Sequence, residues 1–165
     1  AYMDCLAGID FLMNRPEVDG KRVAVEGGSQ GGALALAVAA LDHRVAACCA
    51  NVPFLSDFKT SVLTSVTGNQ MYLRDEFFSE SETGAKARKT VSYVDVRFHS
   101  RRINCPTLIG VGEMDRMCAA PGGVSDYNNI PDSVTKRLLI MAGREHENPP
   151  EYRRAADDWY KKWLK

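Results

Sequence analysis

Residues 22–41 read Arg-Val-Ala-Val-Glu-Gly-Gly-Ser-Gln-Gly-Gly-Ala-Leu-Ala-Leu-Ala-Val-Ala-Ala-Leu, and this stretch decides the fold. It starts with a short apolar segment at 22–26, which predicts a buried strand, and ends with an alanine- and leucine-rich run at 33–41, which predicts a buried helix. A glycine-rich turn lies between them. This order indicates one unit of an α/β fold with a mostly parallel sheet flanked by helices.

The same alternation continues on both sides of this stretch. Apolar periodicity predicts a helix over 2–14, which Pro16 ends, and a buried strand over 45–51. Strands joined through helices favour parallel pairing with right-handed crossovers. After residue 97 the alternation resumes, with strands predicted over 106–112 and 136–141 and helices over 121–129 and 151–164.

Residues 52–97 interrupt this pattern. The segment is richer in polar residues, but its aromatic and aliphatic side chains are too frequent for a disordered linker. It predicts a helical insertion or cap at about 55–97. The whole chain, 1–165, is then a single partial domain that carries this insertion.

The turn between the first predicted strand and helix holds a candidate nucleophile. Residues 27–31 match G-x-S-x-G, the pattern of a nucleophile elbow, in which a serine sits on a sharp strand-to-helix turn. Ser29 is therefore the predicted nucleophile, and the backbone N–H of Gln30 is a predicted oxyanion donor at the helix N-terminus. Glycine-rich turns also bind phosphates, but the chain has neither the P-loop lysine nor a G-x-G-x-x-G pattern.

A serine nucleophile needs a base that is oriented by an acid, and in this type of fold the chain order is Ser, acid, His. His43 precedes any acid, and His99 precedes the next core strand, whereas His146 follows the last predicted strand. His146 is therefore the predicted base. Glu113 and Asp115 both follow the strand at 106–112. Asp115 is placed better, at the tip of its loop, and Glu113 is the alternative.

Composition excludes several other roles. The 165 residues fit one domain, the formal net charge is zero, and the basic pairs at 101–102 and 153–154 are too short to indicate nucleic-acid binding. No apolar stretch reaches the ~18 residues that would predict a membrane span. The five cysteines have no metal or disulfide spacing, which favours a reducing compartment such as the cytoplasm.

Several segments together resemble the acetyl xylan esterase and cephalosporin-C deacetylase family, carbohydrate esterase family 7, whose fold is that of an α/β-hydrolase. The Gly-Gly-Ser-Gln-Gly-Gly block at 27–32 is the most specific of them. The other segments that carry the resemblance lie at 15–19, 22–25, 34–42, 52–55, 93–96, 103–112, 114–118, 127–130 and 146–147. The likeness runs through essentially the whole chain and corresponds to the C-terminal part of the family's fold.

The resemblance implies a serine esterase that removes acetyl groups from acetylated sugars and related small esters. It implies Ser29 as nucleophile, Asp115 as acid and His146 as base, with no cofactor and no metal, and a homo-oligomer, often a hexamer. Two segments depart from the family pattern without removing a catalytic group. They are residues 119–121, where the family tends to have consecutive prolines, and residues 143–146.

The resemblance also implies a missing part. The family's N-terminal half supplies further strands and the second oxyanion N–H, and neither is present in these residues. We therefore expect weak or no turnover from this chain alone, and an uncovered edge on the strand at 22–26 that a second copy or a chain with the missing half would cover. The alternative function is an inactive fragment that serves as an interaction or structural domain.

Overall fold

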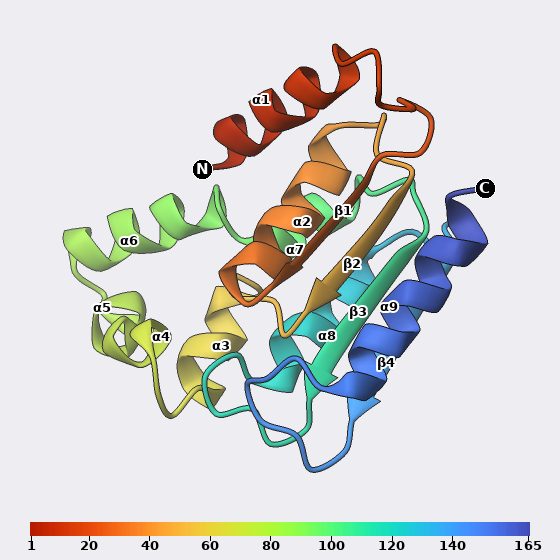
Figure 1. The fold of residues 1–165 in the computed structure, drawn as a ribbon. Coiled ribbons are helices and arrows are strands. Elements are labelled where there is room, and N and C mark those ends of the chain that lie inside the picture. The colour runs from red at the N-terminus through yellow and green to blue at the C-terminus, as the bar shows by residue number, and fades with distance from the viewer.

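The computed structural model describes residues 1–165, except for the side chains of Asn69 and Gln70. Its centre is a parallel sheet of four strands in the order β1-β2-β3-β4 (Figure 1). The strands are β1 (Ala24–Gly28), β2 (Ala47–Asn51), β3 (Thr107–Gly112) and β4 (Lys136–Met141). Because all four run in the same direction, their carboxyl ends meet at one edge of the sheet.

Helices join the strands and cover both faces of the sheet. The longer ones are α1 (Tyr2–Met13), α2 (Gln30–Leu41), α8 (Ala120–Asn129) and α9 (Pro150–Trp163). Five further helices lie between β2 and β3: α3 (Phe58–Thr64), α4 (Asn69–Tyr72), α5 (Arg74–Phe78), α6 (Glu82–Ser92) and α7 (Val96–Ser100). The helical segment predicted at about 55–97 is therefore present, and α7 at its end contacts α2 and α8.

The alternation of side chains along the strands builds two hydrophobic cores. Cys48 and Ile109 point to one face, where α2, α7 and α8 pack. Cys49 and Leu108 point to the other face, which α9 covers with Tyr152 and other apolar side chains (Figure 1). Burial on both faces explains why β2 and β3 read as continuous apolar runs in the sequence.

The predicted α/β architecture is confirmed, with one correction at β1. The sequence predicts a buried strand at 22–26, but β1 starts two residues later and is only half-buried. The reason is its position, because β1 pairs with β2 alone and forms an edge of the sheet, as the family resemblance led us to expect. Burial of a strand depends on its neighbours, which periodicity within the strand does not report.

No helix in the described part of the chain combines the length and apolar character needed to cross a bilayer.

Candidate active site

Ser29 occupies a strained turn between β1 and α2. Its backbone lies at φ 56° and ψ −121°, a region that non-glycine residues rarely adopt. The turn is held by backbone hydrogen bonds on both sides: the N–H of Ser29 donates to the carbonyl of Asn51 over 2.9 Å, and its carbonyl accepts from the N–H of Phe54 over 3.0 Å. Strain that the surroundings enforce in this way is typical of functional positions.

At two positions of this turn, Gly27 and Gly32, the neighbouring backbone leaves no room for a side chain. A Cβ at Gly27 would overlap the carbonyl of Gly31, and a Cβ at Gly32 would lie 2.8 Å from the carbonyl oxygen of Asn51. Positions 28 and 31 have open space in this chain. The close approach of β1 and α2 that is expected for an elbow therefore depends on the absence of a side chain at Gly27, in the strand.

Gln30 is the first residue of α2, so its backbone N–H has no acceptor within the helix. Beside it lies a cavity of about 350 Å³, lined by Ser29, Gln30, Phe54, Gly68 and Met117. A free N–H at a helix N-terminus favours negative charge in the space that it faces.

Asp115 and His146 come together across loops from different strands. His146 Nδ1 lies 2.8 Å from Asp115 Oδ2. The second carboxylate oxygen, Oδ1, accepts the backbone N–H groups of Met117 and Cys118, each over 2.8 Å. The Asp115 side chain is fully buried, whereas a quarter of the His146 side chain is exposed. This carboxylate therefore has a fixed orientation, and it orients the imidazole.

Two neighbours raise the pKa of His146 above its ordinary value. The larger effect comes from the hydrogen bond to Asp115, and the next from Cys118, while burial acts in the opposite direction. A carboxylate on Nδ1 stabilises the imidazolium that forms when Nε2 takes up a proton.

The structure places the remaining candidates elsewhere. The Glu113 carboxylate accepts the backbone N–H of Gly143 over 2.8 Å and so braces the loop after β4, and no hydrogen bond joins it to the His146 imidazole among the described residues. His99 Nε2 lies 2.9 Å from the carbonyl of Tyr93, and His43 follows α2 at the opposite end of the sheet. No hydrogen bond joins Ser29 Oγ to His146 within the described part of the structure.

The sequence marked residues 52–55, after β2, only as part of the family resemblance and did not predict their conformation. Val52, Leu55 and Asp57 all have positive φ angles, at 40°, 55° and 45°. This turn carries Phe54 to the cavity beside Ser29. Aspartate tolerates a positive φ, but Val52 and Leu55 are residue types that give no signal of this conformation.

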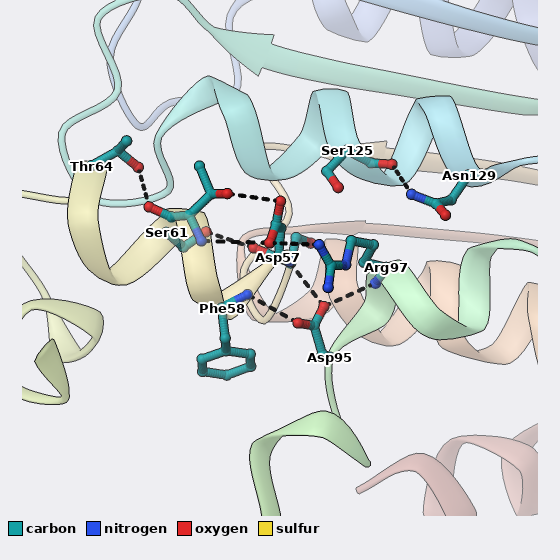
Figure 2. A network of polar contacts seen from close by, with 10 residues as sticks. Asp57, Phe58, Ser61, Thr64, Asp95, Arg97, Ser125 and Asn129 are labelled. Carbon is teal, nitrogen blue, oxygen red and sulfur yellow. Dashed lines mark hydrogen bonds and ion pairs between the residues drawn. The ribbon is translucent and has the colours of Figure 1, made fainter. Parts of the chain in front are cut away.

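A polar network fixes the end of this turn (Figure 2). The Asp95 carboxylate accepts the backbone N–H groups of Asp57 and Phe58 at 2.9 and 3.0 Å, and Arg97 forms an ion pair with Asp57 at 3.1 Å. Asp95 is buried, and burial raises the pKa of its carboxyl although three backbone N–H groups oppose that shift. These hydrogen bonds and this ion pair offset the energetic cost of the positive φ at Asp57.

The parallel sheet, the strained strand-to-helix serine and the Asp-His pair at the same sheet edge define an α/β-hydrolase. The comparisons then identify the family. The model of the acetyl xylan esterase (AXE1) family matches residues 1–164, and the chain belongs to this family.

Individual relatives agree with this assignment. Acetyl esterase Axe7A of Xylanibacter ruminicola is 37% identical over 166 residues, which cover 99% of this chain and 36% of that protein. Acetyl xylan esterases of a Paenibacillus and a Thermoanaerobacterium species match with TM-scores of 0.90 and 0.89. Both are 32% identical, over 99% of this chain and 52% of theirs. The chain thus spans about a third to a half of these relatives.

Proposed function

We propose that this chain carries the catalytic groups of a serine esterase that removes acetyl groups from acetylated sugars. The observation that carries the proposal is the Asp115–His146 hydrogen bond of 2.8 Å at the sheet edge where Ser29 sits on its strained turn. Membership in the acetyl xylan esterase family supports the choice of an acetyl ester.

In the proposed mechanism, His146 Nε2 takes the proton of Ser29 Oγ as this oxygen attacks the ester carbonyl carbon. Asp115 holds the imidazole in the tautomer that leaves Nε2 free, and it stabilises the cation that forms. The N–H of Gln30 stabilises the oxyanion. His146 then gives the proton to the sugar oxygen as the ester C–O bond breaks, and the sugar leaves with a free hydroxyl. The same imidazole takes a proton from a water molecule as this water attacks the acetyl-enzyme, and it returns that proton to Ser29 Oγ as acetate leaves.

We further propose that these 165 residues alone turn over slowly or not at all. The family resemblance assigns the second oxyanion N–H to residues beyond this stretch, and loss of one such donor costs on the order of 100- to 1000-fold in rate. The free edge of β1 would be covered in the working protein by a second copy or by the missing strands.

An assay of acetyl ester hydrolysis tests the proposal. The protein as the cell makes it and the isolated 165-residue chain are compared with their Ser29→Ala variants. We expect Ser29-dependent acetate release from the first and little from the second. Activity that survives Ser29→Ala would overturn the nucleophile, and robust turnover by the isolated chain would overturn the need for a further donor.

A further inference from the structure

The nucleophile and the base come from strands that are not neighbours. Ser29 follows β1 and His146 follows β4, and two strands lie between them. Three strand spacings of about 4.8 Å separate β1 from β4 by roughly 14 Å. The loop that carries His146 must therefore run back across the ends of β3 and β2 before the imidazole can approach Ser29.

The first part of this crossing lies on the end of β3. The N–H of Met114 donates to the carbonyl of Arg144 over 2.8 Å. A Cβ at Gly112, the last residue of β3, would overlap the carbonyl of Glu145. The loop therefore passes in direct contact with the strand end, and the missing side chain at Gly112 makes room for it.

The second part of the crossing is held by Asn51, the last residue of β2. Its side-chain Nδ2 donates to the carbonyl of Glu147 over 2.8 Å, one residue beyond His146. Its backbone carbonyl accepts the N–H of Ser29 over 2.9 Å. One buried residue, 2% exposed, thus makes hydrogen bonds to the segments of both groups.

The chemistry of this position favours a role in the site over a role in stability. Asn51 Oδ1 is buried without a hydrogen-bond partner among the described residues, which costs free energy that an apolar side chain would avoid. The bond to Glu147 requires a donor, because a carbonyl only accepts. A buried amide that is half unsatisfied, at the point where two functional loops meet, is the kind of local conflict expected at a functional site.

We propose that Asn51 is a positioning residue that fixes the position of the His146 loop relative to Ser29. The inference rests on the proposed function and extends it, since Asn51 touches neither the ester nor the reacting atoms. Displacement of a catalytic group by about 1 Å costs on the order of 100-fold in rate. Loss of the amide is therefore expected to lower kcat and to leave KM nearly unchanged.

The test uses the protein as the cell makes it, with an acetyl ester as substrate. Asn51→Ala is expected to lower kcat about 10- to 100-fold with KM within about twofold of the parent value. Asn129→Ala is the matched control, because Asn129 Nδ2 also donates to a backbone carbonyl, that of Ser125, over 2.8 Å in α8 (Figure 2). That control is expected to keep kcat within about twofold.

Asn51→Asp separates positioning from simple stabilisation, and as an isosteric change it keeps the test open if Asn51→Ala does not fold. A carboxyl at this place can donate to the carbonyl of Glu147 only when it is protonated. A Cβ at Gly110 would touch both Asn51 Oδ1 and the Tyr152 ring, so this phenol lies near the amide. Burial raises the pKa of Tyr152, so it stays neutral. The kcat of Asn51→Asp relative to the parent should therefore fall as pH rises.

The outcomes are distinct from those that test the proposed function. If Ser29→Ala or His146→Ala keeps the parent's turnover, the proposed function fails. If both abolish turnover while Asn51→Ala and Asn51→Asp keep the parent's kcat and pH profile, the inference about Asn51 alone fails. A loss in Asn51→Asp that is the same at every pH and parallels a lower melting temperature would also overturn it, since that is the pattern of a purely structural residue.

Discussion

His146 Nδ1 lies 2.8 Å from Asp115 Oδ2, and this carboxylate is held from its other side by the N–H groups of Met117 and Cys118. Asp115 is therefore oriented before any substrate binds. In Ser-His-Asp sites, a carboxylate placed on Nδ1 in this way fixes the tautomer of the imidazole.

Replacing Asp115 by Asn tests this relationship. The amide keeps one oxygen for the two backbone N–H groups but presents an N–H to the imidazole, so kcat should fall about 10,000-fold, as in the Ser-His-Asp template. Because Asp115 raises the pKa of His146, its loss should also move the acid limb of kcat/KM to lower pH. Steady-state rates from pH 5 to pH 9 measure both effects.

Glu113→Gln is the matched control, since Glu113 is the neighbouring carboxylate in the same loop. Its Oε2 accepts the N–H of Gly143 over 2.8 Å, and a glutamine oxygen can accept the same bond. Its kcat should stay within about threefold of the parent. A loss as large as that of Asp115→Asn would mean that the acid has been assigned to the wrong residue.

A second prediction concerns the elbow. Gly27→Ala places a Cβ against the carbonyl of Gly31, and such overpacking against backbone should lower the free energy of unfolding by about 2–3 kcal/mol. Gly31→Ala meets open space inside α2 and should be neutral or stabilising by up to about 1 kcal/mol. Urea unfolding of both variants gives the comparison, and equal losses would contradict the steric argument.

The elbow and the order of elements were predictable because they depend on local sequence. The local sequence is enough to predict a glycine-rich turn between an apolar strand and an alanine-rich helix. The strands and helices after residue 97 repeat the same apolar pattern. The apolar pattern of residues 22–26 alone predicted a buried strand, whereas the family resemblance predicted the uncovered edge that β1 has.

The positioning residues were missed for a similar reason. Asn51 is the last residue of the strand predicted at 45–51, and its bond to Glu147 joins residues 96 positions apart. The backbone at the positive φ of Asp57 is held by Asp95, and the N–H of Val52 donates to the carbonyl of Gly110. Contacts of this kind become visible only when the folded chain brings distant segments together.

The polar network at the end of the turn after β2 gives a third prediction. Asp57 caps α3, since its side chain accepts from the N–H of Thr60, and it pairs with Arg97 at a positive φ of 45°. Asp57→Ala removes the cap and the pair and should cost about 1–3 kcal/mol of stability. Asp57→Asn keeps an acceptor and tolerates the left-handed conformation, so it should cost less than about 1 kcal/mol. If urea unfolding gives the same loss for both, the cap is not what holds the turn.

The last prediction concerns a buried carboxyl, Asp126, which the proposed mechanism does not use. Ser56 Oγ lies 2.5 Å from Asp126 Oδ2 and 3.1 Å from the carbonyl of Phe54. One hydroxyl proton serves one acceptor, so a proton on Asp126 lets both contacts be hydrogen bonds. Burial raises the pKa of Asp126 well above its ordinary value, which agrees with a neutral carboxyl.

A raised pKa in the folded state makes stability fall with pH, because the unfolded chain releases its proton near pH 4 while the folded chain keeps it. Asp126→Asn retains a donor for Ser56 and removes this linkage. The free energy of unfolding of the variant relative to the parent should therefore rise between pH 4 and pH 7. The exposed Asp75→Asn controls for loss of one carboxyl. Parallel pH profiles of urea unfolding for Asp126→Asn and the parent would show that Asp126 is ionised in the folded protein.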